Sequence, residues 1–265
     1  MVRIGKREGG GLLTKEDARA AGLAFEEPSE TSCEFCGRRL EPLGAAFQGR
    51  VMWVAHEPCG CEGEQARSEE EERRRRAEEE AEMARKVASS GIGKRFRDAR
   101  TSIPAAISFL ESFGENRGRG LYIRGGTGAG KTTAACAVAR ALIYSGYRVR
   151  VTTTLAMLDA IRDGYDSGAR GASAIGTWTC CDLLVLDDLG KENANSWAMT
   201  TLFQVVNERY EAMLPTIFTS QYRIEEIERR MSRSGEQETA AAIASRIRET
   251  CDSVDIGNRD RRSRR

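Results

Sequence analysis

From residue 91 onward, two hydrophobic patterns alternate along the chain. Short apolar runs bounded by Gly or polar residues predict buried strands at residues 121–123, 149–153, 183–186, 216–219 and 254–256. Between them, apolar residues spaced three or four apart predict helices at residues 132–145, 154–163, 196–210, 224–231 and 239–247. Strands separated by helices imply an α/β fold, with a parallel sheet flanked by helices on both faces.

A third pattern precedes this region. Residues 64–86 are almost entirely Glu, Arg and Ala without Gly or Pro, which predicts one solvated helix. Glu69 to Glu72 each stand four residues before one of Arg73 to Arg76, the spacing that favours ion pairs along a helix. We interpret the block as a stiff charged linker, with a contact to nucleic acid or to a partner protein as the alternative.

These changes in composition divide the chain into four segments. Residues 1–30, rich in Gly, Glu and Lys, predict a mobile arm or a short helix. Residues 31–63 hold four of the eight cysteines and the single histidine, and predict a small metal-binding module. Residues 64–90 form the charged helical linker, and residues 91–265 form the α/β domain.

Charge and hydropathy exclude several classes of protein. The net charge of +1 balances 41 basic against 40 acidic side chains, which argues against a uniformly charged surface but not against local patches such as the five arginines of residues 259–265. No run approaches the roughly 18 apolar residues of a membrane span, and the first twenty residues lack the apolar core of a secretory signal. We therefore expect a cytoplasmic protein whose cysteines are thiols or metal ligands.

A phosphate-binding loop is the strongest local motif. Directly after the first strand of the α/β domain, the chain fits the pattern G-x-x-x-x-G-K-[ST] in the strand-to-helix context that this pattern requires. Lys131 is expected to reach the β- and γ-phosphates, and Thr132 to bind Mg²⁺ through its hydroxyl. The residues expected around the nucleotide are Gly125, Gly126, Thr127, Gly128, Ala129, Gly130, Lys131, Thr132 and Thr133.

Two acids end the buried strand at residues 183–186. Asp187 and Asp188 follow it directly, at the edge of a parallel sheet where ligands bind. We expect Asp187 to hold the magnesium shell and Asp188 to orient the attacking water.

In this region the sequence resembles a family. The runs at residues 91–97, 183–192, 207–210, 215–221 and 243–248 are similar to the AAA+ ATPases of the DnaC/DnaI helicase-loader and IstB transposition-helper group. The resemblance covers residues 91–265, and it implies ATP hydrolysis and self-association through the AAA+ domains.

The resemblance also implies roles for single residues. Gln221 occupies the position of a polar sensor that is usually Asn in the family, and Thr219 or Ser220 is a candidate to share its role. Arg246 matches an arginine finger that acts on the nucleotide of a neighbouring subunit. Arg262, or Arg261 beside it, matches a second basic sensor.

The cysteines of residues 31–63 have the spacing of zinc ligands. Cys33 and Cys36 form a C-x-x-C pair, and His56, Cys59 and Cys61 supply three candidates for the two remaining tetrahedral positions. We favour the set of four cysteines, with His56 as the alternative fourth ligand. The other cysteines, Cys136, Cys180, Cys181 and Cys251, are expected to pack as small apolar groups.

Together these features predict an ATP-dependent replicative helicase loader. It would bind ATP, Mg²⁺, Zn²⁺ and single-stranded DNA, and the family implies that the zinc module docks on a hexameric DnaB-type helicase. Candidate DNA contacts are Lys94, Arg95, Arg97, Arg100 and the arginines after Gly257. The alternatives are an IstB-like transposition helper or a phage regulatory ATPase that binds duplex DNA, and a nucleotide-gated scaffold with little turnover. A small-molecule kinase is disfavoured because no acceptor pocket or lid is evident.

Overall fold

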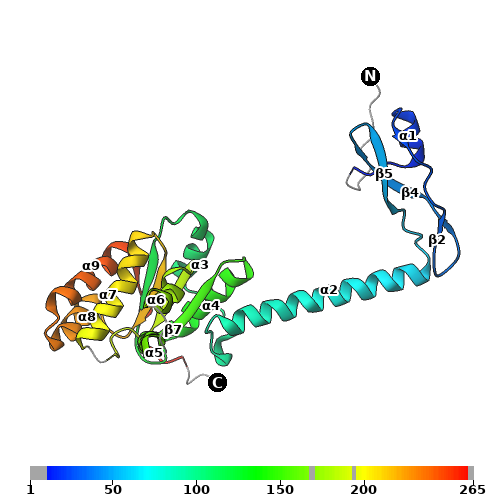
Figure 1. Ribbon diagram of the computed structural model, residues 1–265. Helices are drawn as coiled ribbons and strands as arrows, with labels where there is room; N and C mark the ends of the chain where they lie inside the picture. Colours follow the sequence, from blue (N-terminus) through cyan, green and yellow to red (C-terminus); the bar gives the residue numbers. More distant parts are fainter. Residues whose placement is uncertain (1–10, 167–170, 193–194, 262–265) are drawn as a thin grey trace. The chain divides into compact units, whose positions relative to one another are not determined.

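The computed structural model describes residues 11–166, 171–192 and 195–261 (Figure 1). The chain divides into two compact units, Met1–Glu80 and Ala81–Arg265. Helix α2 (Glu62–Ser89) crosses the boundary between them. Within the described ranges, no helix combines the length and the apolar composition that a membrane span requires.

A five-stranded sheet forms the centre of the second unit. Its strands are β6 (Gly120–Arg124), β7 (Val149–Thr153), β8 (Leu183–Asp187), β9 (Thr216–Ser220) and β10 (Cys251–Asp255). They lie in the order β10-β6-β9-β8-β7, and every neighbouring pair is parallel. All carboxyl ends therefore meet at one edge of the sheet, and the predicted parallel α/β fold is confirmed.

Helices connect these strands. They are α3 (Pro104–Glu111), α4 (Lys131–Tyr144), α5 (Thr154–Asp166), α6 (Gly171–Thr179), α7 (Ser196–Glu211), α8 (Ile224–Met231) and α9 (Gln237–Thr250). Short 3₁₀ turns lie at η1 (Lys94–Phe96), η2 (Phe113–Glu115) and η3 (Ser232–Ser234). The five helices predicted in this region are all present, whereas α3 and α6 were not predicted.

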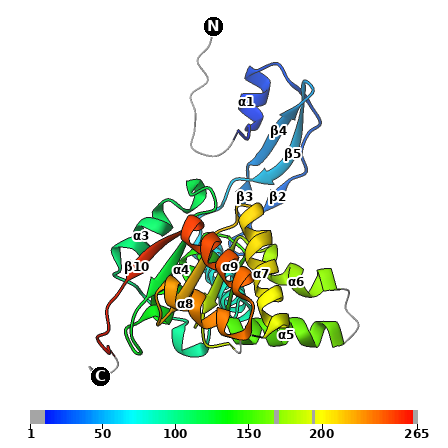
Figure 2. The ribbon, with the colours of Figure 1, turned by 90° about the vertical axis from the view of Figure 1, so that its left-hand side faces the viewer.

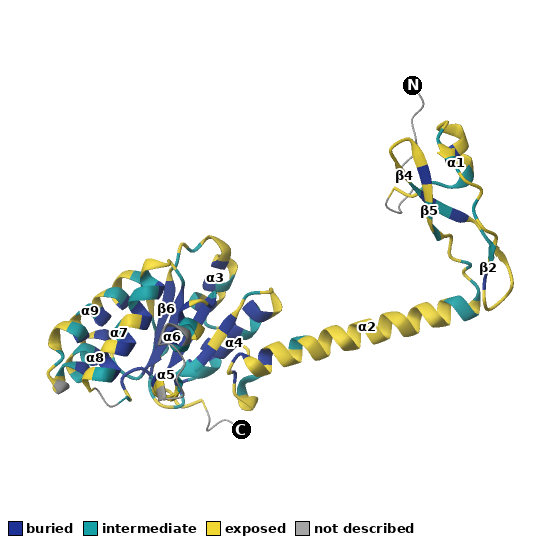
Figure 3. Cartoon of the chain, viewed as in Figure 1, coloured by how far each residue is buried: buried dark blue, intermediate teal, exposed yellow. Residues whose placement is uncertain are grey.

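The alternating side chains of the sheet build two separate cores. On β8, Leu184 and Leu186 pack with α5 to α9, whereas Leu183 and Val185 pack with α3, α4 and the end of α2. All four side chains are completely buried, as strands covered on both faces require. Figure 2 shows the helices around the sheet, and Figure 3 shows that their inward faces are the buried ones.

The end of α2 belongs to the second unit. Val87 is buried and Met83 packs beside it in the core that contains α4. After the helix, Ser90 O accepts a hydrogen bond from Val151 N at 2.7 Å, so the main chain covers the outer edge of β7. A Cβ at Gly91 would lie 1.9 Å from Val151 O, which leaves room for glycine only.

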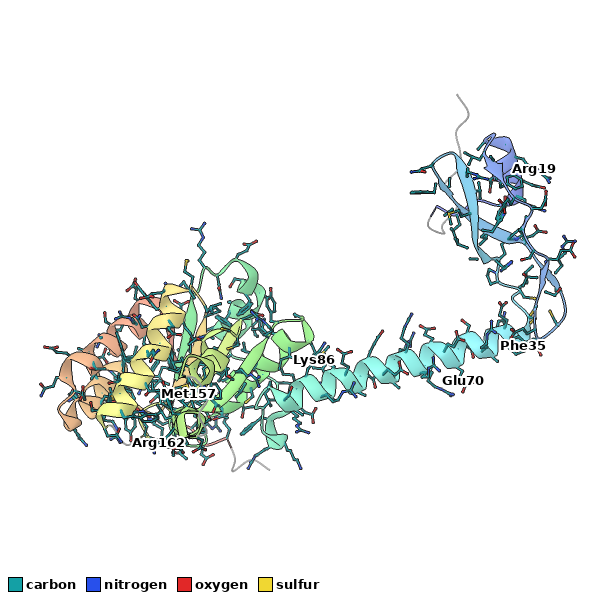
Figure 4. All side chains as sticks on the ribbon, viewed as in Figure 1. Arg19, Phe35, Glu70, Lys86, Met157 and Arg162 are labelled. Carbon is teal, nitrogen blue, oxygen red and sulfur yellow. The ribbon has the colours of Figure 1, made fainter. Side chains whose placement is uncertain are left out.

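The helix predicted at residues 64–86 is confirmed as part of α2, but most of its ion pairs differ from those expected. Every residue from 65 to 82 is exposed, and Figure 4 shows Glu70 projecting from the helix. Of the four predicted Glu-to-Arg pairs, Glu72–Arg76 is formed at 2.5 Å. Glu70 instead contacts Arg73 at 3.8 Å, and Arg74 and Arg75 turn toward glutamates four residues further along the chain. Exposed pairs of this kind contribute little to stability and exchange easily.

The first unit has little apolar interior. Its elements are α1 (Lys15–Ala20), β1 (Ala24–Phe25), β2 (Thr31–Ser32), β3 (Arg39–Leu40), β4 (Pro42–Phe47) and β5 (Arg50–His56). The sheet order β1-β5-β4 brings part of the N-terminal arm onto the strands of the cysteine-containing segment. Phe25 packs edge-to-face on Trp53, with ring centroids 5.4 Å apart. Few other apolar side chains are buried in the described part of this unit, so its stability needs another source.

Candidate nucleotide and metal sites

The glycine-rich loop, residues 125–130, lies between β6 and α4 at the carboxyl edge of the sheet. Gly128 and Gly130 have φ values of +77° and +101°, where a side chain would be strained. Gly130 is also the N-cap of α4, so the positive end of the helix begins at the loop. A strand, a glycine loop and a helix N-terminus in this order form an anion-binding site.

Lys131 folds back over the loop. Its side chain is buried, and Nζ donates hydrogen bonds to Gly125 O and Gly126 O, both at 2.9 Å. The ammonium group is therefore held at the centre of the curl, where it adds a fixed positive charge to the backbone N–H groups.

Asp187 forms the opposite wall of the site. Its carboxylate accepts hydrogen bonds from Thr132 Oγ1 at 2.9 and 3.0 Å and from Thr219 Oγ1. Burial raises the pKa of Asp187, while the two hydroxyl groups oppose that shift. One carboxylate and two hydroxyl groups in contact are oxygen ligands of the kind that Mg²⁺ prefers.

Thr219 is a site residue whose position the sequence alone left open. It is fully buried and also accepts the backbone N–H of Asp188 at 3.1 Å. Asp188 has a φ of +60°, and its carboxylate pairs with Lys191 Nζ at 2.8 Å. Ser220, the other candidate at this position, donates instead to Leu189 O at 2.7 Å.

A cavity of about 690 Å³ opens beside the loop. Its lining includes Lys131, Thr132, Asp188 and Gln221, so these four sequence-predicted residues lie around one cavity. A segment at residues 95–103 forms another wall. Arg95 and Arg100, predicted as DNA contacts, therefore face a space of the size that small-molecule sites occupy.

The C-terminal tail runs along the same loop. Gly126 N donates to Gly257 O and Arg261 N donates to Gly128 O, each at 3.0 Å. A Cβ on Gly128 would lie 2.1 Å from an oxygen of Asp260. Arg261 lines the cavity, whereas Arg262 lies outside the described residues.

Arg246 lies elsewhere on the same unit. It belongs to α9 and contacts α7, where its Nε donates to Asn207 Oδ1 at 2.7 Å. It is not among the residues that line the cavity described above.

The four predicted cysteines come together in the first unit. The Sγ atoms of Cys33, Cys36, Cys59 and Cys61 all lie within 4.8 Å of one another. Cys33 and Cys61 are 3.7 Å apart, and Cys36 and Cys59 are 3.2 Å apart, distances far beyond a disulfide. Four thiolates around Zn²⁺ with bonds of about 2.3 Å would lie about 3.8 Å from one another. The donor set therefore fits a tetrahedral zinc ion.

The turns around the cysteines also suit a metal. Backbone N–H groups of Cys36 and Phe35 lower the pKa of Cys33 to about 7, which favours its thiolate, whereas the neighbouring Cys36 thiol raises the pKa of Cys59 to about 12 in the metal-free cluster. Gly37 and Gly60 have positive φ values beside the two cysteine pairs. His56 ends β5 and is not part of the cluster.

The remaining cysteines follow the prediction with one exception. Cys136, Cys181 and Cys251 are buried, and burial raises the pKa of each thiol. Cys180 is exposed, so the prediction that it packs in the core was wrong. It follows the last residue of α6, and its neighbour Cys181 takes the inward position.

Comparison with known proteins identifies a family for the part of the chain that contains the nucleotide site. A family model described as "IstB-like ATP binding protein" matches residues 69–265. The chain belongs to this family. The match includes the glycine-rich loop, both acids and Arg246, and it excludes the four cysteines. The family therefore supports ATP binding, whereas the cysteine cluster rests on its own geometry.

This IstB-like chain is similar in sequence to two curated helicase loaders. The replicative helicase loader DnaI of Bacillus subtilis (strain 168) is 26% identical over 167 residues, which cover 60% of this chain and 53% of that protein. The replicative helicase loader DnaC of Escherichia coli (strain K12) is 24% identical over 127 residues, which cover 48% and 51% respectively. The chain thus spans about half the length of these curated relatives.

A solved structure supports the same fold. The crystal structure of the DnaC helicase loader superposes with a TM-score of 0.53 at 24% identity, and covers 62% of this chain and 99% of that chain. The resemblance to the DnaC/DnaI and IstB group predicted from sequence is confirmed.

Proposed function

We propose that this protein is an ATPase of the AAA+ type that assists the loading of a replicative helicase. The observation that carries the nucleotide part is the contact of Thr132 with Asp187 beside the buried Lys131. Mg²⁺, when bound with ATP, neutralises charge on the phosphates and polarises the reacting group. Thr132 and Asp187 would hold that ion, and Lys131 would contact the β- and γ-phosphates.

Residues near the γ-phosphate would orient the attacking water. Asp188 and Gln221 both line the cavity, and Thr219 fixes the backbone of Asp188 through its hydroxyl. The side chain of Gln221 is one methylene longer than the Asn usual in the family. Arg261 also lines the cavity, and Arg262 is the alternative basic sensor.

Arg246 would complete the site of a neighbouring copy. It is partly exposed and is not among the residues that line its own cavity, which supports a role on the site of another copy. Because the transition state spreads negative charge over the γ-phosphoryl oxygens, an arginine supplied by a neighbour couples hydrolysis to self-association.

The cysteine cluster would bind one structural Zn²⁺. Four thiolates close the coordination sphere and leave no open position for catalysis. The metal would supply the stability that the small interior of this unit lacks. Residues 31–63 would then dock on a hexameric DnaB-type helicase in the cytoplasm, while the AAA+ domain contacts single-stranded DNA through basic residues such as Lys94 and Arg97.

The decisive experiment combines hydrolysis with loading. We expect the full chain to hydrolyse ATP with Mg²⁺, to bind a replicative helicase, and to increase the amount of helicase on single-stranded DNA. Lys131→Ala is expected to abolish hydrolysis, and Cys36→Ser to abolish helicase binding while hydrolysis persists. If the full chain neither binds the helicase nor changes its deposition on DNA, the loader function is refuted.

The family itself supports a second candidate, a transposition helper or phage regulatory ATPase that binds duplex DNA. Hydrolysis stimulated by duplex DNA but not by single strands, together with binding of a recombinase, would favour it. Brisk turnover with either DNA would exclude a scaffold that binds nucleotide without hydrolysis.

A further inference from the structure

Arg246 sits against one face of α7. Phe203, Asn207 and Tyr210 are four and three residues apart on that helix, so they lie on one stripe. The guanidinium carbon of Arg246 lies 4.8 Å from the ring centre of Phe203 and 5.4 Å from that of Tyr210. Its Nε donates to Asn207 Oδ1 at 2.7 Å. We call these three α7 residues the Arg246 cradle.

The cradle is held in place by a second row of hydrogen bonds. Asn207 Nδ2 donates to Glu211 Oε1 at 2.8 Å, so the amide can present only its oxygen to Arg246. Tyr210 Oη donates to Glu249 Oε1 at 2.9 Å, which fixes the second ring. Both ends of the Asn207 amide are therefore committed, and its orientation is defined.

This arrangement leaves the outer edge of the guanidinium group available. Nη1 makes one long contact, to Ala242 O at 3.5 Å, and within residues 11–166, 171–192 and 195–261 we find no hydrogen bond from Nη2. A guanidinium group recognises phosphate through two parallel N–H groups. With Nε engaged by Asn207 and two aromatic rings beside the guanidinium carbon, the terminal nitrogens are the part that remains for an anion.

We propose that Asn207, with Phe203 and Tyr210, is a positioning site that presents the terminal nitrogens of Arg246 to the nucleotide phosphates of a second copy of this chain. The proposal rests on the proposed function, because it requires that Arg246 act between subunits. Asn207 acts through Arg246 and is a positioning residue. An arginine without such contacts would lose side-chain entropy each time two copies associate. The cradle restricts the rotamers of Arg246 already in the single folded chain, which lowers that cost.

The test uses the full chain and a double-mutant cycle. Asn207→Leu keeps the size of the side chain but cannot accept a hydrogen bond, and we expect kcat for ATP hydrolysis to fall about tenfold with KM unchanged. Asn207→Asp keeps the acceptor for Arg246 but loses the donor to Glu211, so it should retain more activity than Asn207→Leu and less than the wild type. Gln204→Leu is the matched control, because Gln204 makes the same amide-to-glutamate bond to Glu208, at 2.9 Å, and among the described residues it forms no hydrogen bond with Arg246.

Arg246→Ala separates positioning from a structural role. If Asn207 acts through Arg246, Asn207→Leu has no further effect on kcat in the Arg246→Ala background. A second readout is self-association with a non-hydrolysable ATP analogue, which both single variants should weaken similarly and Gln204→Leu should not. Additive losses of kcat, or a lower melting temperature that accounts for the loss, overturn the positioning role.

Arg246→Ala and Asn207→Leu distinguish a failure of the proposed function from a failure of the cradle proposal. If Arg246→Ala leaves hydrolysis and self-association unchanged, the action of Arg246 between subunits is wrong, and the cradle proposal falls with it. If Arg246→Ala impairs both readouts while Asn207→Leu impairs neither, the proposed function stands and the cradle proposal alone is overturned.

Discussion

Arg209 offers a quantitative test of how the second unit is held together. The side chain is only 1% exposed, and its guanidinium group hydrogen-bonds to four neighbours. Its partners are Trp178 O at 3.0 Å, Cys181 O at 2.9 Å, Pro215 O at 2.7 Å and Thr216 Oγ1 at 2.9 Å. These residues precede β8 and begin β9, so one arginine joins the entrances of the two strands that lead to the nucleotide site.

Arg209→Met keeps most of the aliphatic stem and removes every donor. Pro215 O would still accept Leu184 N at 3.4 Å, but Cys181 O would lose its donor and Trp178 O would keep only a thiol contact at 3.6 Å. Two orphaned carbonyl groups cost about 1–3 kcal/mol each. Burial lowers the pKa of Arg209, so the loss of a buried cation offsets part of this cost. We expect a net destabilisation of about 3 kcal/mol.

Calorimetry of the full chain measures this effect. For a domain of this size, about 3 kcal/mol lowers the melting temperature of the second unit by about 6–12 °C. Arg229→Met on α8 is the control, because Arg229 is exposed and makes one 3.3 Å contact to Glu225 O. A melting temperature for Arg209→Met within about 2 °C of the wild type would show that these buried hydrogen bonds contribute no net stability.

Three further predictions concern the sites. Gly128→Ala forces a side chain into a positive φ and against the C-terminal tail, so we expect about 1–2 kcal/mol of destabilisation and weaker nucleotide binding. Adding Asp260→Ala should restore only the part of the lost stability that comes from the contact with Asp260. An unchanged melting temperature of Gly128→Ala would contradict this prediction. A chelator or Cys36→Ser should release one zinc ion per chain and abolish the near-ultraviolet circular dichroism of the first unit, whereas Cys180→Ser should do neither. Zinc retained by the Cys36 variant would contradict the ligand set. The folded-state pKa of Asp187 is raised, so its contribution to the stability of the metal-free protein is present below the unfolded pKa and is lost as pH rises through the folded pKa. The melting temperature of Asp187→Asn should therefore rise relative to that of the wild type as pH increases. A difference in melting temperature that stays constant with pH would contradict the raised pKa.

Local sequence signals predicted the strands and helices that carry strong periodicity. The bounds of β7 and α8 agree fully with the prediction, because both have clear apolar spacing and polar ends. Helix α6 was missed because its Gly, Ser and Thr residues have weak helix propensity, and its position depends on the packing of Ile175 and Trp178 in the core. The strands of the first unit are too short for periodicity to identify.

Some residues of the candidate site could be predicted from the sequence, and others could not. The glycine-rich loop, Asp187 and the cysteine pairs are contiguous motifs, so sequence identified them. Thr219 reaches Asp187 because β9 lies directly beside β8, with Phe218 paired to Leu186. Residues 95–103 reach the cavity, and Asn207 reaches Arg246, through the same kind of long-range packing. Strand order and helix packing are properties of the folded chain, and spacing along the sequence does not encode them directly.

The junction after α2 determines where the second unit begins. A fragment starting at Gly91 would lack Val87, leaving a hole in the core, and would leave Val151 N without the carbonyl of Ser90. An uncovered, flat edge strand readily pairs with other chains. The last turn of α2 and the residue after it therefore cover an edge of the sheet that would otherwise be open to pairing with another chain.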